Sequence, residues 1–413
     1  MAYEYPLLPL GQIVNNCDAR RVPLSGKERE QRQGCFPYYG ANGIMDYIDN
    51  YLYEGLHLLI AEDGSVEMAD GKPCLQLVNG KFWVSNHAHV LKGTTDEETK
   101  YIYYALSNTR IRPFMTGSVQ AKLSQANMNR IPIPYPTRET TRQAIVHILG
   151  SLDDKIEVNR KLNLALEEMT KAVFKSWFLD FDPVRAKLEG RDTRLPKHIA
   201  DLFPDSFEDS ELGQVPKGWK IGVFEEAFDL VMGQSPPGES YNEIGIGQPF
   251  YQGRTDFTFR YPKHRVYCTA PTRFAKLGDT LVSVRAPVGD INMAGEDCAI
   301  GRGVAAVKHK SGSRSFTYYS MLSLKRTFDT FEAGGTVFGS INKNDFYKLA
   351  LIIPEDRLIV QFERLCGPFD KTIENNESQS LTLAALRYAL LPKLISGKLP
   401  LIDADRFVER SYG

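Results

Sequence analysis

Two windows of the sequence contain lysine and arginine but no acidic residue. Residues 101–138 hold five basic side chains and residues 299–328 hold six, although the whole chain has a net charge of −1. Clustered basic side chains attract a polyanion whatever the net charge, so this distribution favours a nucleic-acid partner over two merely solvated surfaces. The compensating acids gather elsewhere, notably at Asp205, Glu208, Asp209 and Glu211.

The residues that could read a nucleic acid are polar side chains in loops. Arg binds guanine and Asn or Gln binds adenine through paired hydrogen bonds, whereas other polar groups position the protein on phosphates. On these grounds we predict six contacts in each half of the chain, with ordinary surface polarity as the alternative for each. They are Tyr39, Asn86, His87, Ser118, Gln120 and Lys122, followed by Gln252, Arg254, Arg285, Arg302, Thr336 and Lys343.

These loops belong to a pattern that occurs twice. Residues 117–123 (GSVQAKL) are similar to residues 335–341 (GTVFGSI), 218 residues later. A repeat this long is a duplicated domain, since solenoid units have only about 20–50 residues. Two similar domains suit a partner with two-fold symmetry, of which duplex DNA is the commonest, and we place the two basic windows at equivalent positions. Further matches pair residues 58–61 with 281–284 and residues 150–153 with 367–370.

Each half of the chain combines a strand-rich domain with a long helix. We predict α+β domains with mixed β cores at residues 1–136 and 216–354, helices at 137–180 and from 355 into the C-terminal tail at 413, and a linker at 181–215. With Ile145 and Phe362 at heptad position a, most a and d residues are apolar, which predicts a coiled coil. The predicted pairing residues are Leu152, Asn159, Leu166, Phe369, Asn376 and Leu383.

Asn159 and Asn376 interrupt the two apolar series at equivalent a positions. A buried Asn pair lowers stability but fixes the register of two helices. We therefore predict that both are buried between the helices; the alternative is that both face solvent.

Motifs for catalysis by the chain itself are absent. The sequence has no Asn/Asp-Pro-Pro-Tyr/Phe motif of an adenine methyltransferase, no glycine-rich dinucleotide motif after a strand and no P-loop. The six cysteines show no metal-ligand spacing, which predicts reduced thiols in a cytoplasmic protein. No apolar run reaches the ~18–20 residues that span a bilayer. We expect no catalytic residue, metal or cofactor in this chain, and no membrane partner.

Five motifs together resemble the specificity subunit of Type I restriction–modification systems, over essentially the whole chain. The motifs lie at residues 37–43, 58–64, 174–184, 278–289 and 391–397. The resemblance implies two target-recognition domains separated by two long antiparallel helices, in a pseudo-two-fold repeat. Each domain would read one half of a bipartite, asymmetric site on double-stranded DNA.

The same resemblance implies partners. The helices would set the gap between half-sites and dock two methyltransferase subunits, and motor-nuclease subunits would complete the complex. S-adenosylmethionine, ATP and Mg would then be used by those partners and not by this chain. The alternatives are a fused or stand-alone adenine DNA methyltransferase, and a structural coiled-coil adaptor without a DNA role.

Overall fold

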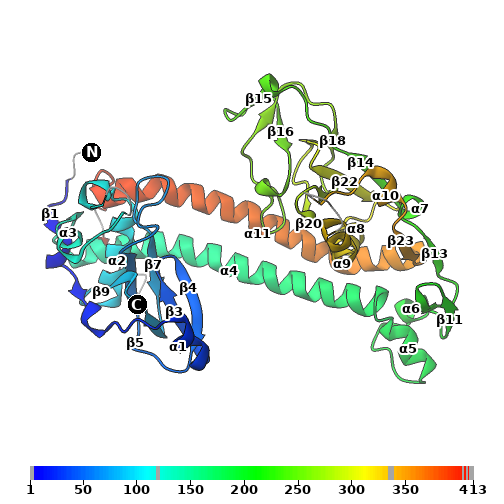
Figure 1. Ribbon diagram of the computed structural model, residues 1–413, viewed down its shortest axis with the longest axis horizontal. Coiled ribbons are helices and arrows are strands. Elements are labelled where there is room, and N and C mark those ends of the chain that lie inside the picture. The colour runs from blue at the N-terminus through cyan, green and yellow to red at the C-terminus, as the bar shows by residue number, and fades with distance from the viewer. Residues whose placement is uncertain (1–3, 118–120, 334–338, 402–403, 406–407, 409–413) are drawn as a thin grey trace. The chain divides into compact units, whose positions relative to one another are not determined.

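The chain forms two compact units. The computed structural model describes residues 4–117, 121–333, 339–401, 404–405 and 408 (Figure 1). Unit 1 comprises Met1–Val158 and Gln379–Gly413, and unit 2 comprises Asn159–Ser378. Each unit contains one β-rich domain and a part of both long helices, α4 (Glu139–Phe178) and α11 (Asp356–Ser396). Among the described residues, no helix is long and apolar enough to cross a membrane.

Unit 1 contains two four-stranded sheets, in the orders β2-β9-β6-β7 and β4-β3-β8-β5, and the short pair β1-β10. Helix α2 packs on the first sheet, where every residue of β6 is buried. The Thr95 side chain caps α2, and three acids in its first turn favour the helix dipole. The strands are β1 (Leu7–Pro9), β2 (Asn15–Asn16), β3 (Gln33–Gly40), β4 (Gly43–Ile48), β5 (Tyr53–Glu54), β6 (His57–Ala61), β7 (Leu75–Val78), β8 (Lys81–Val84), β9 (Ala88–Lys92) and β10 (Pro132–Pro134). The shorter helices are α1 (Gly26–Gln31), α2 (Asp96–Ser107) and α3 (Gln125–Asn129).

Unit 2 contains a four-stranded sheet, β14-β22-β19-β20, a five-stranded sheet, β15-β17-β16-β21-β18, and the pairs β13-β23 and β11-β12. The strands are β11 (Phe207–Ser210), β12 (Gly213–Pro216), β13 (Lys220–Val223), β14 (Phe228–Met232), β15 (Tyr241–Asn242), β16 (Gln248–Tyr251), β17 (Tyr267–Cys268), β18 (Phe274–Ala275), β19 (Thr280–Val284), β20 (Val288–Met293), β21 (Cys298–Ile300), β22 (Val304–His309) and β23 (Ala350–Ile353). The shorter helices are α5 (Asp182–Leu188), α6 (Lys197–Ala200), α7 (Phe224–Ala227), α8 (Arg314–Ser323), α9 (Lys325–Ala333) and α10 (Lys343–Tyr347). The predicted α+β fold class is confirmed.

The segment from 181 to 215, expected as a linker, is folded and packed on unit 2. Phe181 and Phe203 are buried in the core of this unit. The ring of Phe203 lies 5.4 Å from that of Trp177 on α4, and the ring of Phe181 lies 5.5 Å from that of Trp219. The segment therefore fastens the end of α4 to the second β domain.

The two long helices run in opposite directions. In unit 2, Asn159 lies against Asn376, whereas Phe174 packs on Phe362. Asn159 is 1% exposed, and its side chain donates to the Asn376 carbonyl at 3.3 Å. The Asn376 amide donates to Oδ1 of Asn163 at 2.8 Å. The alternative that both asparagines face solvent is therefore wrong: Asn159 is buried, as predicted, and Asn376 is half-buried.

The predicted heptad register was correct for one series of positions and wrong for the other. The predicted a residues, which include all six predicted pairing residues, are buried or half-buried along both helices. The second series of the seam lies one residue later than predicted, at positions such as Asn163, Thr170 and Cys366, all buried. The prediction failed because it took only apolar side chains for the seam, whereas the structure buries the polar Asn163 and Thr170 in the same series as the apolar Leu149 and Ile373. At the predicted d positions Leu162, Met169, Leu365 and Leu386 are 42%, 53%, 40% and 46% exposed.

A buried arginine fixes the second β domain to both helices inside unit 2. Arg260 is 0% exposed, and its guanidinium contacts Asp370 of α11 at 2.8 Å and Glu167 of α4 at 3.5 Å. It also donates to the Tyr319 hydroxyl at 3.0 Å and lies 4.0 Å from the centre of the Tyr318 ring. The segment that follows β16 is thereby held on the helical frame.

Candidate nucleic-acid interface

Four predicted contact residues of unit 2 meet around one groove. Gln252, Arg254, Arg285 and Arg302 line a hollow of about 620 Å³. They come from three loops, which follow β16, β19 and β21. The groove thus lies where the four-stranded and five-stranded sheets of unit 2 adjoin.

Close backbone packing shapes this groove. A Cβ atom on Gly303 would lie 2.2 Å from the Gln252 carbonyl oxygen, so only glycine lets the two loops approach. On the neighbouring loop, the Ser283 hydroxyl donates to the Pro287 carbonyl and accepts from the Asp290 amide, both at 2.8 Å. These contacts hold the loops that carry Arg285 and Arg302.

The groove has an unbalanced positive charge. Arg254 pairs with Asp290 at 3.2 Å, with more than half of its side chain exposed. Arg285 and Arg302 are also exposed, and within the described part of the chain neither has an ion-pair partner. Exposed guanidinium groups without internal partners can form paired hydrogen bonds with guanine or phosphate.

The other two predicted contacts of unit 2 lie elsewhere. Lys343 is the first residue of α10, is exposed, and has its ammonium 5.0 Å from the centre of the Tyr347 ring. Thr336 falls outside the described residues. The groove therefore rests on the other four residues, together with Ser235 and Tyr241, which line it and had not been predicted. Tyr241 donates to the Pro236 carbonyl at 2.7 Å, an interaction with no signal in the sequence.

In unit 1 the predicted contacts converge on a pair of acids. Asn86 and His87 form the exposed turn between β8 and β9. The His87 ring nitrogen Nδ1 lies 2.7 Å from Asp63, and the Lys122 ammonium lies 3.2 Å from Glu62. Both basic side chains are thus engaged by carboxylates to which no role had been assigned.

The remaining predicted contacts of unit 1 are Tyr39, Ser118 and Gln120. Tyr39 is half-buried in β3, and its ring packs edge-on against Phe82 at 5.8 Å. Burial raises the pKa of its hydroxyl. Ser118 and Gln120 fall outside the described residues.

A network of charges supports the unit 1 loops from behind. Arg21 lies 2.8 Å from Glu62 and 3.2 Å from Asp18, and the buried His89 lies between Asp18 and the Leu123 carbonyl, the latter at 2.8 Å. Burial alone would raise the pKa of Asp18. The hydrogen bonds from His89 and the Val90 amide, with the nearby positive charges, outweigh that effect, so the net shift of the pKa is downward. The carboxylate is therefore held in its charged form.

Matching backbone hydrogen bonds define equivalent positions in the two units. The Ser85 amide donates to the Tyr39 carbonyl at 2.9 Å, as the Gly301 amide does to the Tyr251 carbonyl at 2.8 Å. Asn86 follows Ser85 and Arg302 follows Gly301, so Asn86 and Arg302 occupy equivalent positions in the two units.

A second pair of bonds aligns the neighbouring loops. Leu123 donates to the Glu62 carbonyl at 2.8 Å, and Ile341 donates to the Val284 carbonyl at 3.1 Å. Asp63 is therefore equivalent to Arg285, and each forms an isolated bridge to the loop opposite.

Two sequence alignments are corrected by these bonds. The match of residues 58–61 with 281–284 is wrong by one residue, because strand register and not the apolar pattern sets the equivalence. Residues 299–328 correspond to about residues 83–110, so the two basic windows overlap only in part and are not equivalent.

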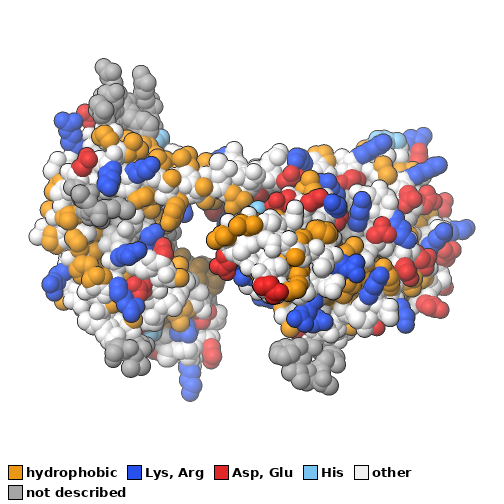
Figure 2. Space-filling model, turned by 90° about the horizontal axis from the view of Figure 1, so that it is seen from above, with side chains coloured by type: hydrophobic (Ala, Val, Ile, Leu, Met, Phe, Trp, Pro, Cys, Tyr) orange, Lys and Arg blue, Asp and Glu red, His pale blue; other side chains and the backbone are white. Residues whose placement is uncertain are grey.

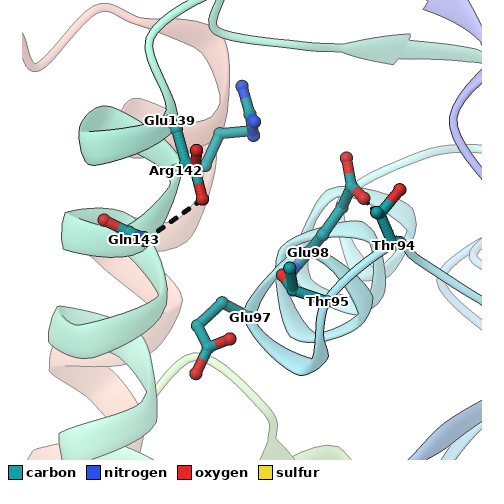
Figure 3. Close-up of a pocket in the computed structure, with 7 residues that line it drawn as sticks. All are labelled: Thr94, Thr95, Glu97, Glu98, Glu139, Arg142 and Gln143. Atoms are coloured by element: carbon teal, nitrogen blue, oxygen red, sulfur yellow. Dashed lines mark hydrogen bonds between the residues drawn. The ribbon is translucent and has the colours of Figure 1, made fainter.

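A pocket in unit 1 is lined mainly by acidic side chains, unlike the basic groove of unit 2. It has a volume of about 270 Å³ and lies between the starts of α2 and α4 (Figure 3). Glu97, Glu98 and Glu139 line it beside Arg142, and Gln143 donates to Glu139 at 3.4 Å. Three carboxylates against one guanidinium make this pocket unsuitable for phosphate.

The fold and the basic groove define a class: an α+β chain with two related domains on paired long helices. Residues 8–168 match the family described as Type I restriction modification DNA specificity domain. Among solved structures, the S subunit of the Type-I restriction-modification system from M. genitalium has the same fold, with a TM-score of 0.63 and 14% identity over 95% of this chain and 96% of that chain.

Sequence relatives agree with this family. A putative type I restriction enzyme MjaX specificity subunit of Methanocaldococcus jannaschii is 29% identical over 68% of this chain and 62% of its own, so the chain spans less than two thirds of that relative. The HindI specificity subunit of Haemophilus influenzae is 25% identical over 66% of this chain and 70% of its own. The predicted relationship is therefore confirmed: the chain is a relative of the specificity subunits of Type I restriction–modification systems.

Proposed function

We propose that the chain is a DNA-recognition subunit that has no catalytic site of its own. The observation that carries this proposal is the groove of unit 2, where Arg285 and Arg302 are exposed without ion-pair partners in the described part of the chain. A duplex supplies both the phosphates and the base edges that such side chains bind. Unit 1 would present the Asn86–His87 turn and Lys122, although His87 and Lys122 are paired with Asp63 and Glu62 in the free chain.

The two units would read different half-sites of one bipartite site. The reason is that equivalent loop positions carry different chemistry, with Asp63 in unit 1 where Arg285 stands in unit 2. A single recognised sequence repeated symmetrically would require matching side chains. The long helices would then set the gap between the half-sites.

We further propose that the outer faces of the helices dock two methyltransferase subunits. Met169 of α4 and Leu386 of α11 are equivalent in the repeat and are both about half exposed. Leu164 and Leu381 form a second equivalent pair, also exposed. Figure 2 shows apolar side chains on the surface among charged ones. Apolar side chains at equivalent positions of two helices suit two copies of the same partner.

A binding experiment tests the DNA proposal. The full chain, alone and with a methyltransferase subunit, is titrated against duplexes carrying the site found by methylation mapping, at several salt concentrations. We expect specific binding that weakens as salt rises, because phosphate contacts release counterions. Arg285→Ala and Arg302→Ala should each weaken specific binding, while Lys263→Ala, an exposed lysine outside the groove residues, should not. Specific binding unaffected by either arginine substitution would contradict the assignment of the groove.

The same preparation tests the alternative of a stand-alone methyltransferase. S-adenosylmethionine, ATP and Mg would belong to partner subunits, so the isolated chain should bind none of them. Calorimetry with S-adenosylmethionine, using the assembled complex as the positive control, would reveal a methyltransferase site in this chain if one existed.

A further inference from the structure

The turns that contain Asn86 and Arg302 are the same structural element in the two units. Besides the bonds from Ser85 and Gly301, the Glu62 amide donates to the His87 carbonyl and the Val284 amide donates to the Gly303 carbonyl, each at 2.9 Å. Asn86 and Arg302 precede these two carbonyl residues. Two independent backbone bonds on each side therefore give the two side chains one position in the fold.

Both side chains are available to a ligand. Asn86 and Arg302 are exposed, and no side-chain hydrogen bond or ion pair of either occurs within the described parts of the chain. Their main chains are nevertheless anchored: Arg302 donates its amide to the Ser235 hydroxyl at 3.4 Å, and Arg21 donates to the Asn86 carbonyl at 3.5 Å. A fixed backbone with an unengaged polar side chain is suited to reading a base edge.

The neighbouring position differs in charge. Beside Arg302, unit 2 places Arg285 in the same groove. At the equivalent place unit 1 has Asp63, which is already engaged by His87 at 2.7 Å. Arg302 and Arg285 offer only hydrogen-bond donors, whereas the Asn86 amide of unit 1 can both donate and accept.

We propose that these two equivalent residues set the base read by each unit: guanine by Arg302 and adenine by Asn86. Guanine presents two acceptors in the major groove, N7 and O6, which suit a guanidinium. Adenine presents an acceptor at N7 and a donor at N6, which a guanidinium cannot accept but an amide can. This inference rests on the proposed DNA recognition and adds the identity of one base in each half-site.

Exchanging the two residues tests it. The full chain in complex with its methyltransferase partner selects duplexes from a library randomised over both half-sites, as wild type, Arg302→Asn and Asn86→Arg. We expect Arg302→Asn to move one position of one half-site from guanine to adenine, with the ratio of the two bases changing at least about tenfold. Asn86→Arg should move one position of the other half-site from adenine to guanine. Lys308→Asn, an exposed substitution outside the groove, is the matched control and should leave both preferences unchanged.

The outcomes separate the two proposals. If Arg302→Asn keeps the thermal unfolding of wild type but weakens binding to all selected sequences alike, Arg302 is a phosphate contact and the base assignment is overturned. If Asn86→Arg leaves the selected sequence unchanged, the assignment of adenine to Asn86 is overturned. If the wild-type complex enriches no sequence at all, the proposed DNA recognition itself fails, whatever the variants do.

Discussion

Replacing Arg260 should destabilise the second unit more than any exposed substitution. The Arg260→Met change keeps a long side chain but removes the cation between Asp370 and Glu167. Glu167 retains Lys171 at 2.8 Å, whereas the partner that Asp370 retains among the described residues is the Tyr319 hydroxyl at 3.4 Å. Asp370 is buried, so its carboxylate would lose its main compensation without gaining water. Breaking one partner of a buried ion pair costs about 3–5 kcal/mol, and we expect a loss in that range.

A double replacement separates the ion pair from simple packing. Arg260→Met combined with Asp370→Leu removes both charges, and apolar replacement of a buried pair is often close to neutral. The double variant should therefore recover at least ~2 kcal/mol relative to Arg260→Met alone. Asp370→Leu alone should cost nearly as much as Arg260→Met, because it leaves the guanidinium buried beside Glu167.

Urea unfolding followed by tryptophan fluorescence provides the measurement. Trp177 and Trp219 are buried in the core of unit 2, so a Trp83→Phe background reports on that unit. Free energies of unfolding would be compared for wild type, both single variants and the double variant. A loss below about 1 kcal/mol for Arg260→Met, the value typical of an exposed pair, would refute the reasoning. A double variant no more stable than the single variants would do the same.

Three further predictions follow from the structure. The native pKa of Asp18 is lowered, so the stability it supplies is complete above about pH 4 and is lost as pH falls through the lowered value; urea midpoints of wild type and Asp18→Asn should therefore converge only in acid. Met169→Asp should weaken association with a methyltransferase subunit about tenfold in sedimentation while the melting temperature stays constant, whereas Leu166→Asp in the helix seam should lower both. Residues 216–354 could be replaced with the equivalent domain of a relative that has an arginine at the position of Arg260. This replacement should change one half-site in methylation mapping, and a change in both half-sites would count against independent reading of the half-sites by the two units.

The long helices show how far a heptad pattern can be read from sequence. Their existence and one series of seam positions were predictable because apolar residues recur at the right spacing, whereas the antiparallel direction was implied only by the family resemblance. The second series was not, because shifting it by one residue also gives alternating steps of three and four. Sequence reasoning chose Leu162 and Met169 as core residues, but the seam buries Asn163 and Thr170 instead. The Thr170 hydroxyl donates to the Leu166 carbonyl at 2.9 Å, so it is satisfied within its own helix.

The candidate interface was predictable where the repeat marked it and obscure where contacts are long-range. Gln252, Arg254, Arg285 and Arg302 had been chosen by type and loop position, and the fold brings them to one groove. The acids that engage His87 and Lys122 lay in a recognised motif but carried no sign of their partners. Arg21 gave no signal, because 41 residues separate it from Glu62 and only the folded sheet brings them together.

The two halves of the repeat differ in which surfaces they keep alike. Equivalent positions on the outer helix faces carry similar side chains, as at Met169 and Leu386 or at Leu164 and Leu381. Equivalent positions in the loops carry different ones, as at Asn86 and Arg302 or at Asp63 and Arg285. Similar surfaces bind like partners, whereas loops of different hydrogen-bonding capacity bind unlike base pairs. This contrast supports the proposal that the chain assembles two copies of one partner around a DNA site whose halves differ.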